Sequence, residues 1–101
     1  MTQLEKEIER KLREAVKKRG GLCLKWVCPG WSGVPDRLVL LPGARIFFVE
    51  TKRPDGGRVG RLQNWWRDQL RGLGFPAYIV ANDGELATLL LIIDSVEEVR
   101  P

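Results

Sequence analysis

Histidine is absent from this 101-residue sequence, and cysteine is scarce, at two residues. Without histidine, the Ser-His and Cys-His catalytic groups are excluded, as is the usual general base. A structural zinc site normally takes four cysteine or histidine ligands, so two cysteines argue against zinc. We expect Cys23 and Cys28 to be reduced thiols on or beside a strand, with a disulfide as the alternative. Any catalysis must therefore use carboxylates, lysine and metal.

Long apolar runs, low-complexity tracts and a secretory signal are also missing. No apolar run approaches the roughly 20 residues needed to cross a bilayer, and the alternating charges at the N-terminus are not typical of a signal peptide. We therefore expect an intracellular, cytoplasmic protein, which a virus, a prophage or a bacterial chromosome could encode. The length favours one domain over residues 1–101, and 44% apolar residues suffice for its core.

Positive charge is concentrated in two segments of a chain whose net charge is +4. Residues 1–20 carry seven basic and four acidic groups, and residues 52–71 carry six basic and two acidic groups. Residues 83–100 are mainly acidic. Part of the surface is therefore cationic and suited to a polyanion such as nucleic acid.

Hydrophobic periodicity predicts the element order α-β-β-β-α-β-α, a mixed α/β layer structure. Helices have apolar residues spaced by three or four positions, and they are expected over residues 2–19, 61–72 and 85–92. Short apolar segments between glycine- and proline-rich breakers predict strands over residues 22–27, 37–41, 45–52 and 75–81. Residues 95–101 receive no assignment.

The hairpin around Pro42-Gly43 has two possible registers. A two-residue loop would pair Leu41 with Ala44, whereas a three-residue loop would pair Leu41 with Arg45. Pro-Gly favours a type II turn, which splays hairpin strands, so the tighter loop is disfavoured. The longer loop requires Ala44 to adopt an unfavourable conformation. We therefore prefer the three-residue loop.

The two registers place different residues opposite Asp36. The shorter loop would pair Asp36 with Val49, and the longer loop pairs it with Glu50. Side chains alternate along a strand, so Glu50 and Lys52 share a face. In the preferred register, two carboxylates and one ammonium therefore meet on adjacent strands.

These three groups form a candidate site for phosphodiester hydrolysis. Mg²⁺ prefers oxygen ligands and keeps several waters, so carboxylates from Asp36 and Glu50 and the backbone carbonyl of Thr51 would suffice. Lys52 could orient or deprotonate the attacking water, or stabilise charge on the phosphate. The alternative is that Asp36 is an ordinary turn residue and that Glu50 and Lys52 form a surface ion pair. Against it, Glu50 ends an apolar run, where a buried carboxylate costs free energy unless a cation compensates.

Three motifs occur in order along the chain: Gly33-Val34-Pro35-Asp36-Arg37, Phe48-Val49-Glu50-Thr51-Lys52-Arg53-Pro54, and Gln63. This order resembles the virus-type replication-repair nuclease (VRR-NUC) family of PD-(D/E)xK nucleases. The likeness extends over nearly the whole chain, from the Gly20-Gly21 to Lys25 segment to Gly74-Phe75. It implies a restriction-endonuclease-like core with a mixed sheet flanked by helices, and metal-dependent cleavage of DNA with Mg²⁺ or Mn²⁺.

The resemblance also implies roles by position. Asp36 and Glu50 correspond to metal-binding acids, Lys52 to the catalytic lysine, and Gln63 to a glutamine near the scissile phosphate. For Gln63 the alternative is an ordinary solvated helix position. Thr51 stands where an apolar residue is common, and we expect only its backbone to matter.

A glutamate of the first helix is a contested member of the site. The family often places such a residue near the metal, and Glu5 has suitable spacing. However, residues 2–5 also form a capping box, in which Glu5 would serve the helix end. Glu9 is the rival for the metal role.

Basic and aromatic residues near the motifs are candidates for DNA contacts. The basic residues that could grip the phosphate backbone, although each alone is an ordinary surface charge, are Lys25, Arg37, Arg53, Arg58 and Arg61. We expect Trp26, Trp65 and Trp66 in the core or a subunit interface. Trp31, in a glycine-rich loop, could stack on an exposed base.

The leading hypothesis is a metal-dependent endonuclease that selects DNA by structure. Stand-alone members of this family resemble archaeal junction resolvases, so the resemblance implies a homodimer acting on branched DNA such as four-way (Holliday) junctions, as in DNA repair. No membrane or small-molecule partner is expected. The alternatives are a non-catalytic nucleic-acid-binding module with the same fold, and an interaction domain that uses its tryptophans.

Overall fold

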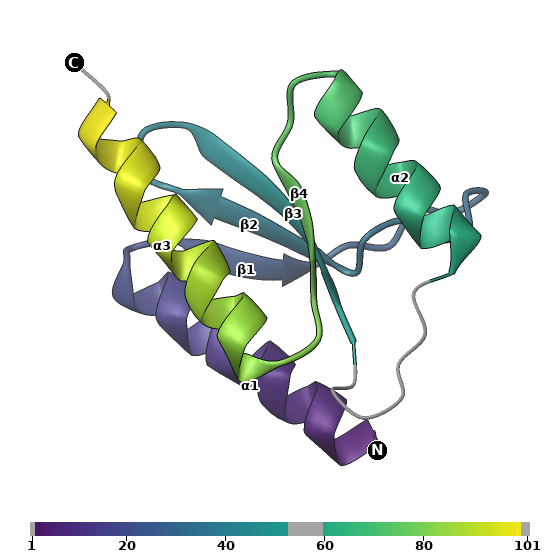
Figure 1. The fold of residues 1–101 in the computed structure, drawn as a ribbon, viewed down its shortest axis with the longest axis horizontal. Helices are drawn as coiled ribbons and strands as arrows, with labels where there is room; N and C mark the ends of the chain where they lie inside the picture. The colour runs from purple at the N-terminus through teal and green to yellow at the C-terminus, as the bar shows by residue number, and fades with distance from the viewer. Residues whose placement is uncertain (1, 53–59, 100–101) are drawn as a thin grey trace.

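The computed structural model describes residues 2–52 and 60–99, with side chains over residues 6–52 and 60–95. The predicted element order is confirmed (Figure 1). The helices are α1 (Thr2–Lys18), α2 (Arg61–Gly72) and α3 (Asp83–Val99), and the strands are β1 (Leu22–Lys25), β2 (Arg37–Leu41), β3 (Arg45–Thr51) and β4 (Ala77–Val80). β1 and β4 are shorter than expected, and α3 is longer. No helix in the described part of the chain is long and apolar enough to cross a membrane.

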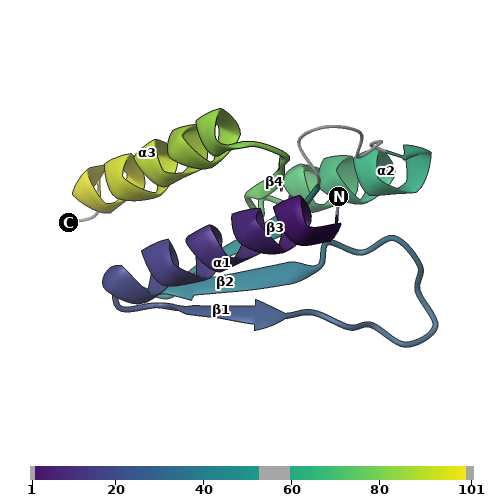
Figure 2. The same ribbon diagram turned by 90° about the horizontal axis from the view of Figure 1, so that it is seen from below.

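The four strands form one mixed sheet in the order β1-β2-β3-β4. β1, β2 and β3 pair antiparallel, and β4 pairs parallel to β3 after the chain has passed through α2. Figure 2 shows α1 and α3 over one side of β1 and β2. The mixed sheet flanked by helices is the expected restriction-endonuclease-like arrangement.

The β2–β3 hairpin has the three-residue loop, because Leu41 pairs with Arg45. Gly43 and Ala44 both have positive φ angles, of 85° and 60°. For alanine this conformation costs roughly 1–2 kcal/mol relative to a right-handed one. The strain predicted for Ala44 is therefore present, and the hairpin tolerates it.

Apolar side chains cover both faces of the sheet, in two clusters. The larger cluster packs α1 and α3 on the sheet and includes Leu12, Phe47, Val49 and Ile93. The smaller cluster packs α2 on the other face, around Phe48, Leu70 and Ala77. Because side chains alternate along β3, residues 50 and 52 continue the face of Phe48, toward α2.

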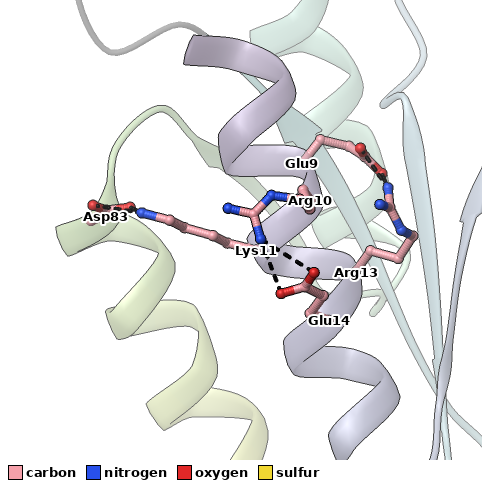
Figure 3. A network of polar contacts seen from close by, with 6 residues as sticks. All are labelled: Glu9, Arg10, Lys11, Arg13, Glu14 and Asp83. Carbon is pink, nitrogen blue, oxygen red and sulfur yellow. Dashed lines mark hydrogen bonds and ion pairs between the residues drawn. The ribbon is translucent and has the colours of Figure 1, made fainter. Parts of the chain in front are cut away.

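Ion pairs on α1 supplement this packing (Figure 3). Two pairs join residues four apart along the helix, and the third joins α1 to α3: Arg10–Glu14 at 3.1 Å, Arg13–Glu9 at 2.7 Å and Lys11–Asp83 at 3.1 Å. The two exposed pairs, Arg10–Glu14 and Lys11–Asp83, contribute about 0.2–1 kcal/mol each. The buried apolar stripe of α1 therefore supplies most of its docking energy.

Both cysteines are free thiols, as expected, and the disulfide alternative is wrong. Cys23 packs against the larger core cluster. Burial raises the pKa of its thiol to about 11. Cys23 therefore behaves as a small core residue.

Candidate active site

Asp36 and Glu50 lie side by side where the β2–β3 ladder ends. The last pair of that ladder is Arg37–Val49. Immediately beyond it, the backbone N–H of Asp36 donates to Glu50 Oε1 at 3.2 Å. The carbonyl of Asp36 accepts from the Trp26 N–H at 2.9 Å, which ties it to the end of β1. The hairpin register thus brings the two carboxylates together, as the spacing predicted.

Thr51 holds both oxygens of the Asp36 carboxylate. Its backbone N–H donates to Oδ1 at 3.0 Å, and its hydroxyl donates to Oδ2 at 2.7 Å. Hydrogen bonds to an ionised acceptor are among the stronger ones in proteins, and Thr51 is only 1% exposed. Sequence reasoning missed this side chain, because it assigned a role only to the backbone. The available signal was a hydroxyl where an apolar residue is common.

Lys52 and Gln63 both approach the second oxygen of Glu50. Lys52 Nζ lies 3.5 Å from Glu50 Oε2, and Gln63 Nε2 donates to the same oxygen at 3.3 Å. Gln63 Oε1 also accepts from the Gly60 N–H at 2.7 Å, at the start of α2. Gln63 is therefore not an ordinary solvated position, since it links the first turn of α2 to the end of β3.

Negative charge is incompletely balanced in this cluster. Glu50 is 9% exposed, and burial is the main reason why its pKa rises to about 7. The neighbouring Asp36 charge raises the pKa further, while Lys52 opposes the rise. Two carboxylates thus share one ammonium, an arrangement that a bound cation would stabilise.

Glu9, one of the two contested glutamates of the first helix, has arginine partners. Glu9 is ion-paired with Arg13 at 2.7 Å (Figure 3) and with Arg37 at 3.6 Å. The side chain of Glu5 lies outside the described residues. Within the described part of the chain, no three acidic, histidine or cysteine side chains form a metal-binding group. Among the described residues, the acids that lie beside each other here are Asp36 and Glu50.

The five expected DNA-contacting residues have different environments. Lys25 is exposed on β1, and Arg61 is exposed at the start of α2. Arg37 is largely enclosed, with 19% of its side chain exposed, and faces Glu9. Arg53 and Arg58 lie outside the described residues.

The mixed sheet with helices on both faces is the fold of the restriction-endonuclease-like class, and two acids and a lysine lie together where β2 and β3 end. No protein-family model matches the chain. The protein named "Putative nuclease p44" from Acyrthosiphon pisum secondary endosymbiont phage 1 is 54% identical over 86 residues, which are 85% of this chain and 90% of that protein. A solved structure described as a VRR_NUC domain has a TM-score of 0.79 and 29% identity, covering 85% of this chain and 92% of that one. The chain belongs to the VRR-NUC family.

Proposed function

We propose that this protein is a Mg²⁺- or Mn²⁺-dependent endonuclease that hydrolyses phosphodiester bonds in DNA, with residues 1–101 as one nuclease domain. The observation that carries the proposal is the cluster in which Asp36, Lys52 and Gln63 all contact Glu50. Similarity to a phage nuclease and to a VRR_NUC domain supports it.

The donor set fits a hard divalent cation. Carboxylate and carbonyl oxygens are the ligands that Mg²⁺ and Mn²⁺ prefer. Asp36, Glu50 and the carbonyl of Thr51 would hold the ion. Burial and the charge of Asp36 raise the pKa of Glu50, and a bound cation would oppose that rise. A divalent cation held there would supply positive charge to stabilise the phosphate in the transition state.

The surrounding side chains have separate tasks in this proposal. Lys52 carries positive charge on the face of Glu50, where it can donate to a phosphate oxygen or to the attacking water. Gln63 donates to Glu50 Oε2, and in this proposal it would lie near the scissile phosphate. Thr51 keeps the Asp36 carboxylate in one orientation.

The proposed substrate is branched DNA such as a four-way junction, selected by structure and cut by a homodimer in the cytoplasm. A chain of 101 residues leaves little surface for reading base sequence. β1 presents apolar side chains to solvent, with Leu22 60% and Leu24 42% exposed, and a second copy could cover them. Sedimentation velocity measures the oligomeric state directly.

The test compares cleavage of labelled junction, flap and linear DNA with and without Mg²⁺ or Mn²⁺. Lys52→Ala should lower the cleavage rate about 100-fold or more, since it removes a catalytic charge, while DNA affinity stays within about threefold because one phosphate contact is a small part of the whole. Lys18→Ala, at an exposed lysine at the end of α1, is the matched control and should cut normally.

Two results would contradict the proposal in different ways. Wild-type protein that binds DNA but cuts no substrate with either metal would be a binding module that keeps the nuclease fold. A Lys52→Ala variant that cuts at the wild-type rate would exclude a catalytic role for Lys52.

A further inference from the structure

Three tryptophans line a pocket beside the candidate active site. Trp31 comes from the loop between β1 and β2, and Trp65 and Trp66 come from α2. The pocket has a volume of about 720 Å³ and also includes Arg61 and Asn64. We call it the tryptophan pocket. None of the residues proposed for catalysis lines it.

Trp66 is the fixed centre of the tryptophan pocket. Its indole N–H donates to the Ser32 carbonyl at 2.8 Å, which ties the loop to α2. Trp31 and Trp65 pack edge-on against Trp66, with ring centroids 5.7 Å and 5.2 Å away. Nevertheless, Trp31 is 61% exposed and Trp65 48% exposed. Much of their aromatic surface is thus left for a further contact.

The two segments that form the pocket also carry residues of the candidate active site. Along the loop, Trp31 precedes the segment that ends at Asp36, and on α2, Asn64 adjoins Gln63. The loop contacts the helix, because the Trp66 indole N–H donates to the Ser32 carbonyl and a Cβ built at Gly33 would lie 2.5 Å from Leu62 Cγ. The pocket is therefore held at a fixed position relative to the carboxylates, and a strand bound at the site would pass beside it.

We propose that the tryptophan pocket binds an unpaired nucleobase of the DNA substrate, and that it supplies part of the preference for branched DNA. This inference rests on the proposed function. Exposed indole rings stack on a free base whatever its sequence. The amide of Asn64 offers a donor and an acceptor to the base edge, and Arg61 offers a cation to the adjoining phosphate. A base inside a duplex is stacked on its neighbours and has no free face.

The charge of the pocket rim favours DNA over a second copy of the chain. Arg61 is exposed on the rim, while the acidic rim residue Asp68 is ion-paired with Arg67 at 3.2 Å. A symmetric dimer built on this surface would bring the same surface of both copies together, and Arg61, Arg67 and Asp68 give each of these surfaces a net positive charge. A polyanion meets no such repulsion.

Fluorescence anisotropy in EDTA tests the proposal without cleavage. The labelled DNAs have equal length, one fully paired and one with an unpaired segment at a branch. Stacking on one base corresponds to roughly a tenfold change in Kd. Trp31→Ala should therefore weaken binding to the unpaired DNA about tenfold, and to the duplex less than about twofold. Trp31→Phe should retain most of the affinity, because a phenyl ring also stacks.

The control variant is Leu91→Ala, which removes an apolar side chain that is 68% exposed on α3, and it should bind both DNAs normally. Equal binding by Trp31→Ala and wild type would overturn the pocket's role and leave the nuclease proposal intact. Selective loss of binding with no cleavage by the wild type would support the pocket and overturn the nuclease. A wild-type dimer that becomes a monomer in Trp31→Ala would assign the pocket to a second copy.

Discussion

Replacing Glu50 with glutamine should stabilise the protein in the absence of divalent cations, increasingly so as the pH rises from 5 to 8. The physical reason is the buried carboxylate, whose pKa is about 7 in the folded protein against an ordinary value of 4.5. Burial and the charge of Asp36 both disfavour the ionised form. Glutamine keeps the shape of the side chain and removes the charge.

The sign of the pH dependence follows from proton binding. Between pH 4.5 and pH 7 the folded state holds a proton on Glu50 that the unfolded state has lost. Raising the pH through this window therefore lowers the free energy of unfolding. The difference between the two pKa values corresponds to about 3 kcal/mol, lost by the wild type above pH 7.

Glutamine recovers only part of that free energy. Its amide NH₂ replaces either Oε1, which accepts from the Asp36 N–H, or Oε2, which accepts from Gln63 and is ion-paired with Lys52. Misplaced donors cost about 1–2 kcal/mol. We therefore expect Glu50→Gln to be more stable than wild type by about 1–2 kcal/mol at pH 8, and equal or less stable at pH 5.

Urea unfolding in EDTA at pH 5, 6, 7 and 8 measures this difference. Glu14→Gln is the matched control, because Glu14 is an exposed glutamate on α1 whose change should give no such slope. A stability difference between Glu50→Gln and wild type that does not grow with pH would refute the raised pKa. At pH 8, Mn²⁺ should raise the Tm of the wild type and leave that of the variant nearly unchanged.

Two further substitutions test the supports of the site. Thr51→Val should lower stability by about 1–2 kcal/mol, because it removes the hydroxyl that donates to the Asp36 carboxylate. It should also weaken Mn²⁺ binding about tenfold, as measured by Mn²⁺ titration followed by thermal unfolding. Thr51→Ser should restore both stability and binding, whereas wild-type Mn²⁺ affinity in the valine variant would exclude a positioning role for Thr51. Gly33→Ala should cost more stability than Gly30→Ala, because both glycines have positive φ but only the added Cβ at position 33 would clash, with Leu62. Equal unfolding free energies of the two alanine variants would contradict that contact.

The hairpin could be predicted from the sequence because its determinants are local. Turn preferences of Pro42-Gly43 selected the loop length, and the loop length set the pairing of Leu41 with Arg45. Counting residues back from the loop along the two strands then places Asp36 opposite Glu50. The strain at Ala44 was predictable for the same reason, since it depends only on the loop.

The extent of α3 depends on residues that are distant in sequence. The predicted helix ended at residue 92, whereas α3 reaches Val99. Arg45 donates to the carbonyl of Ile93 at 2.7 Å from the start of β3, and Arg19 makes two hydrogen bonds to Asp94 at 2.8 Å and 2.9 Å. These contacts stabilise the part of α3 beyond residue 92, and the local sequence pattern does not predict them.

The side-chain role of Thr51 was missed for a different reason. Alternation along β3 places Thr51 and Glu50 on opposite faces, so strand geometry alone does not bring the Thr51 hydroxyl to the acids. Asp36, however, lies beyond the last β2–β3 pair, and its carboxylate accepts from the Thr51 N–H that the ladder leaves without a strand partner. The hydroxyl lies within reach of the second oxygen. The alternation of side chains therefore predicts contacts only within the paired part of the two strands.

The donors that surround the two carboxylates explain why the cluster can attract a metal ion. Apart from the Lys52 ammonium, which lies 3.5 Å from Glu50 Oε2, the donors to Asp36 and Glu50 are backbone N–H groups, a hydroxyl and an amide, all of them neutral. Neutral donors orient a carboxylate without cancelling its charge. Arg37 adjoins Asp36 in sequence, but Glu9 draws its guanidinium toward α1, at 3.6 Å. The fold thus keeps this arginine away from the acids, so their excess negative charge is available to a divalent cation.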